Sequence, residues 1–567
     1  MIASEPEVIQ DHIQRLGQLK LQRELWRPLW QDITDYVLPR RTFWDVDDSS
    51  GKTPSTKAYD GTAIASLQLL VDGMQGNMVS AAFPWLHMVM EDRRLQTIPG
   101  VADHLESIDE IILAVYQRTQ FYESMNEFLM DLGSIGTAVM LVEDDVRNRS
   151  ILFSTRHMKE CYIAENRAGL VDVLYRGFTM TNRQIVETWP DKIDERRKEL
   201  AASTPFSRGN IIHATFPSAD QGFRTIEEPR GAYTDLYIDQ DMQKLLDPGG
   251  YYETFPYLVG RWRKNSDEVY GRSPAADAIQ DILRVNQMAK DLLHTGHMAS
   301  DPPLMLPASL KGKERIVPHG FNYMASDEQI RTVDYSGSYP IGRDQQEAVE
   351  EQIKEIFRSK IFLLLQQLEH GPYTATEIRQ RVAEQVAVLG ATIGRFNNEV
   401  LVPLVRRTYG ILRQTGTIPA PPPQLQGRMK VELQGPLAQA QRRTHQSQGV
   451  DAGMEFLERA VKLLPDGMDN VDQDEFYRIG LDAAGMPQRV IREIPMVEMV
   501  RKRRADALAK QQQAQAAAAT DAQVMGNVDS LNQPVKSGSM LEQMAQQAAK
   551  AQPAQKGAPQ GAVQGAA

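Results

Sequence analysis

Two long stretches with helical periodicity, separated by about 40 irregular residues, constrain the fold of this chain more than any other feature. The first begins at Ser273-Pro274, with Ser as N-cap and Pro at the first helical position, and extends to about Ala299. The second opens with the capping-box pattern Asp344–Glu347 and extends to about Leu368. A connection of this length between matched helices is uncommon in a compact domain and usually functional. We therefore predict an antiparallel helix pair that projects from a body and carries a small module at its tip.

The residues before this pair predict a mixed α+β body. Helical spacing runs from about residue 7 to residue 37, where Pro28 should bend or divide the helix, and again over 62–79 and 125–133. A charged surface helix is predicted at 187–202. Short runs rich in β-branched and aromatic residues predict strands at 138–142, 151–154, 162–163, 170–179, 211–216, 233–238 and 255–263.

A third long helix follows the pair. It opens with the capping box Thr374–Glu377 and continues to about Arg413, and Pro403 should kink it near Glu399. A short loop, residues 369–373, precedes it. Further helices are predicted at 454–464, 474–484 and 488–514, before a Gln/Ala-rich tail that begins at about residue 511.

Composition excludes several classes of protein. The chain has 63 Lys+Arg against 74 Asp+Glu, a formal net charge of −11, so it lacks the basic character of a tight nucleic-acid binder. Its single cysteine excludes an internal disulfide and a thiolate-based structural metal site. The N-terminal residues lack the basic and apolar regions of a signal peptide, and no apolar run approaches the ~20 residues of a membrane span. We expect a soluble, cytosolic protein that does not contact membranes.

No motif supports catalysis. Ser50–Thr53 is similar to the end of a phosphate-binding loop, but Val46 stands where that motif requires glycine. The acidic residues near 45–48 and 143–145 lack a recognisable histidine or lysine partner, so solvated turns explain them better than a nuclease centre. His157 and Cys161 lack a third, orienting group. We predict that the chain is not an enzyme and that it holds no cofactor and no metal.

The apolar stripes of the two matched helices need a partner surface. An isolated helix pair is marginal, and each apolar side chain left in water forfeits roughly 1.5–3 kcal/mol. Either the helices fold back onto the body as ordinary core, or neighbouring copies cover them in a closed ring. For the second alternative, the candidate subunit-interface residues are Ile279, Ile282, Val285, Ile353, Ile356 and Phe357.

A series of short motifs runs through roughly residues 10–420. Its members are Arg23–Trp26, Leu38–Arg40, Tyr59–Ala63, Leu70–Met74, Pro84-Trp85, Asp131–Gly133, Gly136–Ala138, Tyr270–Pro274, Asn286, Pro302-Pro303, Thr374–Glu377, and Glu399 with Pro403-Leu404. In this order the series resembles the portal proteins, or head-to-tail connectors, of short-tailed, podovirus-type bacteriophages. Each motif is modest, and the ordered series is what is specific. No motif after Leu425 matches the family.

The resemblance implies a portal-type α+β fold, assembled as a cyclic ring of twelve subunits around a channel for double-stranded DNA. Such a fold has a mixed α/β wing, long antiparallel stem helices, a small clip and a helical crown. The modules map to the wing at 1–271, the first stem helix at 272–301, the clip at 302–342, the second stem helix at 343–368, the tunnel loop at 369–373, the long kinked wing helix and return segment at 374–445, the crown at 446–510, and the tail, mobile or a helical barrel, at 511–567.

The resemblance also implies function and partners. The ring would stand at one capsid vertex, after assembly in the host cytoplasm, and DNA would be packaged and ejected through it. Its partners would be the terminase large subunit, tail adaptor and tail proteins, major capsid and scaffolding proteins, with internal ejection proteins left open. The alternative function is a minor capsid or scaffold-type structural protein without a DNA channel.

Candidate site residues follow from this mapping. The clip candidates for partner docking are Lys311, Lys313 and Arg315, and the candidates for the DNA channel are Lys354, Arg358, Lys360, Glu369 and His370. DNA contact would be weak, non-specific and salt-sensitive. For each charged residue, the alternative is an ordinary solvated or salt-bridged side chain.

Overall fold

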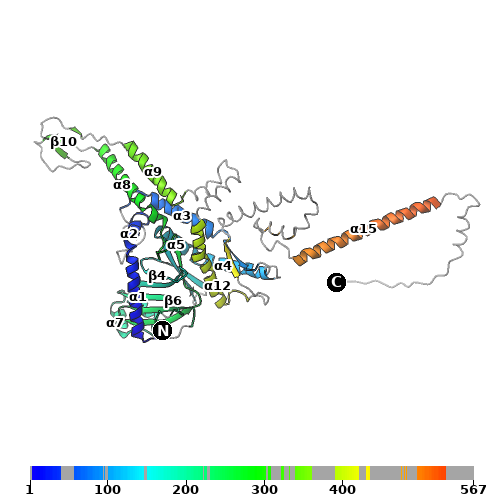
Figure 1. The fold of residues 1–567 in the computed structure, drawn as a ribbon, viewed down its shortest axis with the longest axis horizontal. Coiled ribbons are helices and arrows are strands. Elements are labelled where there is room, and N and C mark those ends of the chain that lie inside the picture. The colour runs from blue at the N-terminus through cyan, green and yellow to red at the C-terminus, as the bar shows by residue number, and fades with distance from the viewer. Residues whose placement is uncertain are drawn as a thin grey trace, which may run out of the picture. The chain divides into compact units, whose positions relative to one another are not determined.

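The computed structural model describes residues 3–39, 57–92, 95, 100–145, 150–220, 222–225, 230–301, 304–307, 321–324, 331–332, 339–359, 390–420, 429–433, 474, 478, 481 and 494–531. The chain divides into two compact units, Met1–Val490 and Ile491–Ala567. The first unit holds the mixed α/β body and the helix pair (Figure 1).

The N-terminal helical stretch forms two helices, as the position of Pro28 predicted. Helix α1 (Glu5–Glu24) ends before Leu25, and α2 (Arg27–Tyr36) begins with Pro28 in its first turn. Proline is accepted there because the first turn has no intrahelical use for its N–H. Helix α1 packs its apolar face, including Val8 and Leu16, against the largest sheet.

That sheet has five antiparallel strands in the order β4-β5-β6-β7-β8. Their bounds are β4 (Cys161–Glu165), β5 (Val171–Thr181), β6 (Arg208–Pro217), β7 (Tyr233–Asp239) and β8 (Lys244–Tyr252). The predicted helix at 187–202 is two shorter helices, α6 (Asn182–Thr188) and α7 (Glu195–Ser203), the second capped by the Asp194 side chain. Apart from β8, which was not predicted, the strands lie where the alternating pattern placed them.

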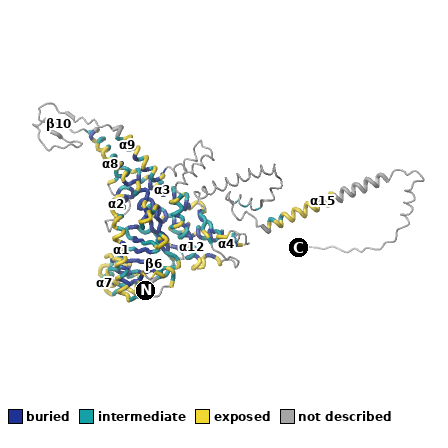
Figure 2. Tube along the Cα trace, in the orientation of Figure 1, coloured by how far each residue is buried: buried dark blue, intermediate teal, exposed yellow. Residues whose placement is uncertain are grey.

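A second, three-stranded sheet lies in the main core of the body. Its order is β3-β2-β9, with β3 (Ser150–Arg156) and β9 (Tyr257–Arg261) antiparallel to β2 (Thr137–Asp145). Helices α3 (Thr62–Met78), α4 (Val101–Arg118) and α5 (Phe121–Ser134) contribute apolar residues to the same core. Figure 2 colours the buried parts of the body dark blue. The strand β1 (Leu86–Met90) pairs with β13 (Met429–Leu433), far along the chain. Helix α4 and this strand pair were not predicted.

The predicted helix pair is present. Helix α8 (Pro274–Ser300) begins as expected, because the Ser273 Oγ accepts a hydrogen bond from the Ala276 N–H at 2.9 Å. It runs beside α9 (Tyr339–Ile356), and Gly342 near the start of α9 lies against Leu292 near the end of α8, so the two helices are antiparallel (Figure 1). Between them in sequence is a small sheet of order β11-β10-β12, with β10 (Leu304–Pro307), β11 (Phe321–Met324) and β12 (Arg331–Thr332).

The bounds of α9 differ from the prediction at both ends. Asp344 lies inside the helix, which begins at Tyr339, so the proposed capping box is not its start. The helix stops at Ile356, because Arg358 adopts a φ of 56° and the Ser359 hydroxyl donates to the Lys354 carbonyl oxygen at 3.0 Å. This turn carries Phe357 into the core. The predicted helix continued to Leu368, but residues 360–368 lie outside the described part of the chain.

The third long helix is described from residue 390 onward; its predicted start at Thr374 lies outside this range. It passes into a π-helical segment, η3 (Asn397–Leu401), and then into α12 (Val402–Gln414). Pro403 cannot donate to the carbonyl four residues earlier, which is that of Glu399, so the regular α-helical hydrogen bonding is interrupted at the position where a kink was predicted.

In the second unit, α15 (Ile494–Leu531) is one continuous helix of 38 residues. It crosses the boundary predicted between a crown ending at residue 510 and a tail beginning at 511. The helices predicted at 454–464 and 474–484 lie outside the described residues, except for 474, 478 and 481.

Candidate functional site

The apolar stripes of α8 and α9 are covered by the chain itself where the two helices leave the body. Helices α2, α3 and α5 pack against them there. Val285, Ile353 and Phe357 are fully buried, Ile279 and Ile282 are nearly so, and Ile356 is half-buried against the same core. For the five buried residues the predicted subunit interface is therefore corrected: they belong to the core of the body, because the bases of both helices lie among its other helices.

The outer part of the pair is different. Beyond Met288 on α8 and before Val349 on α9, the two helices no longer take part in the main core. They enclose an open groove of about 560 Å³, and Leu293 on its edge is 50% exposed. The groove is lined by Ala289, Leu292, Leu293, Gly296, His297, Ser300, Arg343, Gln346, Glu347 and Glu350.

Two of the candidate channel residues lie near the base of α9. The Lys354 Nζ pairs with Glu351 Oε1 at 3.0 Å, so Lys354 takes the salt-bridged alternative on the helix surface. Arg358 is exposed at the left-handed turn that ends α9. The other candidates, Lys360, Glu369, His370, Lys311, Lys313 and Arg315, lie outside the described residues.

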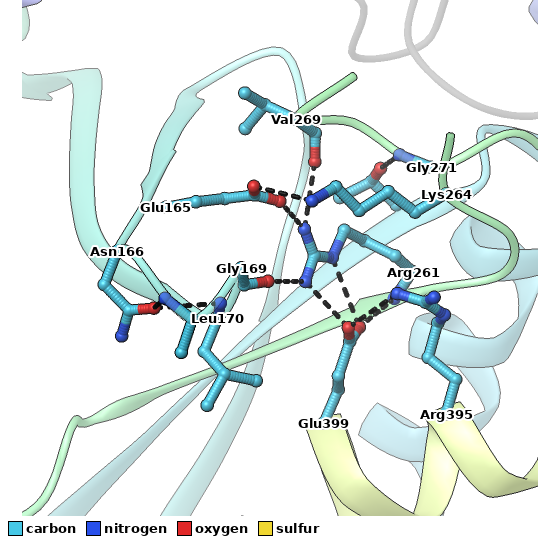
Figure 3. A network of polar contacts seen from close by, with 12 residues as sticks. Glu165, Asn166, Gly169, Leu170, Arg261, Lys264, Val269, Gly271, Arg395 and Glu399 are labelled. Atoms are coloured by element: carbon cyan, nitrogen blue, oxygen red, sulfur yellow. Dashed lines mark hydrogen bonds and ion pairs between the residues drawn. The ribbon is translucent and has the colours of Figure 1, made fainter. Parts of the chain in front are cut away.

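A buried ion network stands close to where the third long helix enters the body (Figure 3). The Arg261 side chain on β9 is fully buried and donates to Glu399 Oε1 at 2.7 Å, to the Gly169 carbonyl oxygen at 2.9 Å, and to Glu165. Lys264 Nζ binds the other Glu165 oxygen at 2.7 Å, and Arg395 donates to Glu399 Oε1 at 3.1 Å. Two carboxylates thus meet three cations, which compensates for the loss of water around them.

The network joins three segments that are distant in sequence. Glu165 ends β4, Arg261 ends β9, and Glu399 lies in the π-helical segment η3. Because Glu399 also accepts from the Arg261 backbone N–H at 3.1 Å, the π-helical segment is fixed to the strand by both main chain and side chain. The helix that follows the predicted loop at 369–373 is therefore anchored to the body at one defined turn.

Comparison with known proteins decides the family. A model of the family described as bacteriophage head to tail connecting protein matches residues 10–491. The chain belongs to this family. The connector is 30% identical to the probable portal protein of Bordetella phage BPP-1 over 547 residues, which cover 92% of this chain and 96% of that protein. It is 26% identical to the portal protein of Salmonella phage epsilon15, over 89% of this chain and 92% of that protein.

Among solved structures, the connector is similar to a chain in the neck of an empty gene transfer agent particle, at 12% identity. The match covers 73% of this chain and 91% of that chain, with a TM-score of 0.30, which is too low to establish a shared fold.

The structure describes His157 and Cys161, two of the residues weighed for catalysis, and it gives each of them its own surroundings. Cys161 is fully buried, and burial raises the pKa of its thiol to about 12, so it stays protonated at neutral pH. His157 Nδ1 accepts a hydrogen bond from the Lys159 backbone N–H at 2.9 Å. Among the described residues, no group of three or more His, Cys, Asp and Glu side chains is placed to bind a metal ion. Within the same residues, no helix combines the length and hydrophobicity needed to cross a membrane.

Sequence reasoning named Glu399, through the family resemblance, but missed Arg261 and Glu165. A signal for Arg261 was present, since it is a basic residue in the predominantly apolar stretch 255–263. Pairing with Glu165 and Glu399 depends on contacts across 96 and 138 residues, which no local pattern contains.

Proposed function

We propose that this connector is the portal of a bacteriophage, a closed ring of twelve subunits through whose central channel double-stranded DNA is packaged and ejected. The observation that carries the proposal is the family match over residues 10–491, together with two relatives named as portal proteins that align along nearly their whole length. The ring would occupy one vertex of the capsid, and its subunits would assemble in the host cytoplasm.

The helix pair is the proposed stem, with α8 and α9 as its two helices and residues 302–338 as the clip at its tip. Because the bases of both helices are already buried, subunit contacts in the stem fall on the outer part. The groove between α8 and α9, with Leu293 half exposed, is the surface we assign to a neighbouring copy. The anchored helix, described from residue 390 onward, would hold the tunnel loop at 369–373 towards the channel.

The net negative charge of the chain supports a channel that conducts DNA without binding it tightly. A ring of twelve chains at −11 each would carry about −130 in total, which discourages strong adhesion of DNA to the ring as a whole. Buried cations of the body, such as Arg261 and Arg197, are neutralised by carboxylates of the same chain. These two buried cations would be unavailable to passing DNA, which is consistent with sliding.

The partners follow from this role. The clip, with Lys311, Lys313 and Arg315, would dock the terminase large subunit and later the tail adaptor. Capsid, scaffolding and internal ejection proteins would contact the rest of the ring. Since no catalytic constellation was found in the sequence, the energy for packaging would come from the terminase and not from this chain.

A threading experiment tests the channel. Purified rings are dissociated, reassembled with either closed circular or linear duplex DNA, and washed in about 1 M salt, where electrostatic contacts are screened beyond ~3 Å. A ring that encircles DNA retains the circle and loses the linear duplex by sliding. Equal loss of both forms would contradict a closed channel and would favour a scaffold-type structural protein.

A further inference from the structure

The helix α15 contains a cluster of positive charge, although the chain as a whole is acidic. Arg501, Lys502, Arg503 and Arg504 are consecutive, in a protein whose net charge is −11. The next ten residues after Lys510 contain no charged side chain. The positive charge is therefore confined to a short length of the helix.

The four cations surround the helix. Successive residues of an α-helix are turned by about 100°, so four in a row point in four directions, and any direction perpendicular to the axis lies within about 50° of one of them. Every residue from Arg501 to Gln515 is exposed (Figure 2). In the part of α15 whose side chains the structure describes, Lys502, Arg503 and Arg504 make no ion pair, whereas Arg501 has a contact of its own. We call these four residues the basic belt.

We propose that the basic belt binds the phosphate backbone of double-stranded DNA. The inference rests on the proposed ring, because cyclic symmetry arranges one α15 per subunit about a common axis. Whichever face of α15 turns towards that axis, each subunit presents at least one cation to it. Twelve subunits then make a single positive ring, in an assembly whose other charge is mainly negative.

The shape of the belt favours DNA over the other anionic partners. An acidic protein would dock on one side of the helix and leave the cations of the far side unused. An anionic membrane binds helices that gather apolar residues on one face, whereas Met496, Met499 and Leu508 are spread around α15. Duplex DNA presents one charge per ~1.7 Å and requires no particular face. Because the belt is short along the helix, it contacts few phosphates, which allows DNA to slide.

The experiment measures binding of a fluorescent duplex of about 30 base pairs to full-length rings over a series of salt concentrations. The test variant is Lys502→Gln/Arg503→Gln/Arg504→Gln, since glutamine keeps helix propensity. The control Arg183→Gln/Arg196→Gln/Lys198→Gln removes the same charge from the exposed surface of α6 and α7. The charge-conserving variant Lys502→Arg/Arg503→Lys/Arg504→Lys keeps the three positive charges but exchanges the side chains. It therefore shows whether DNA binding depends on the charge or on the particular side chains.

We expect the test variant to bind about tenfold more weakly at about 50 mM salt, with a salt slope shallower by about one or more. The surface control and the charge-conserving variant should stay within about twofold of the unaltered ring under the same conditions. The single variant Arg503→Gln removes one charge instead of three, so its affinity for duplex should lie between those of the unaltered ring and the test variant.

If the test variant and the surface control lost duplex affinity equally, the proposed role of the basic belt would be wrong, but the proposed ring would be unaffected. Binding of unaltered rings to phosphatidylserine vesicles, without binding to duplex, would also overturn it. Light scattering on each preparation reports whether rings are present. A chain that never forms rings would instead contradict the proposed function.

Discussion

Arg261 is the residue on which the junction of the wing strands and the third long helix depends. Its guanidinium is fully buried and serves Glu165 and Glu399 together, and Glu399 retains only 7% exposure. Replacement of Arg261 by methionine preserves packing volume but leaves two largely buried carboxylates short of their main cation. Breaking a buried pair in this way costs about 3–5 kcal/mol.

We predict that Arg261→Met lowers the free energy of unfolding by about this amount in urea titrations. The matched control is Arg183→Met, whose partner Glu187 and own side chain are each 61% exposed. An exposed pair is worth less than about 1 kcal/mol, so the control should be nearly neutral. Similar small losses in both variants would show that the network does not hold the junction.

His12 gives α1 a pH-dependent attachment to the five-stranded sheet. It is fully buried, stacks on Phe216 with centroids 5.1 Å apart, and lies between the Tyr175 hydroxyl and the Arg224 carbonyl oxygen. Burial lowers the pKa of His12 below its ordinary value of about 6.5. Below that pH the unfolded chain binds a proton that the folded chain does not, so stability falls as pH falls.

The thermal midpoint should therefore decrease between about pH 7.5 and pH 5.5, and His12→Phe should remove part of this dependence. The variant starts less stable, because the Tyr175 hydroxyl loses its partner, but it should lose less on acidification. Parallel pH profiles for the two proteins would assign the acid sensitivity to other groups, such as His104, whose pKa burial also lowers.

At the scale of elements, η3 contains one residue more than a regular α-helical turn would. Such π-helical segments behave as single-residue insertions. Deletion of the exposed Asn398 should therefore restore a regular helix, keep both flanking faces in register and cost no more than about 1–2 kcal/mol. Circular dichroism during thermal unfolding measures the cost.

Deletion of the exposed Arg406 within α12 is the control. It turns the preceding part of the helix by about 100° and takes Leu404 and Val405 out of the core. The chain should then fail to fold cooperatively. If both deletions were equally tolerated, η3 would not set the register of this helix.

The stem makes a second prediction at this scale. Ile353→Asp places a charge in the core and should destabilise the body by more than about 3 kcal/mol. Leu293→Asp alters only the outer groove, so it should leave unfolding within about 0.5 kcal/mol of the unaltered chain but reduce the fraction of rings in light scattering. Intact rings from Leu293→Asp would remove the groove from the subunit contact.

Helical periodicity correctly predicted α1, α2, α3 and α8, because their apolar residues and terminal signals are local. It could not tell what covers an apolar stripe, and the assignment of Ile353 to a neighbour failed for that reason. Helix α4 was not predicted, although it has an apolar stripe at helical spacing, formed by Val101, Leu105, Ile108, Ile112 and Val115. β8 was hidden by Pro248 and two glycines, which an edge strand tolerates.

Of the candidate site, the helix pair with its intervening module was predictable, and so was an irregularity of the third long helix near Glu399, predicted as a kink and found as a π-helical segment. The pairing of β1 with β13 and the Arg261 network were not, because each joins segments separated by long stretches of chain. Such contacts are decided by the tertiary fold and leave no local signal.

At the scale of the whole molecule, the account depends on a closed ring with a hole. The most direct test combines the native mass from light scattering with face-on images of purified particles. Twelve chains of 63.8 kDa predict a mass of about 770 kDa and an annulus with an open centre. A compact particle of 63.8 kDa that never closes into an annulus, or a filament or shell without an axial opening, would contradict the account.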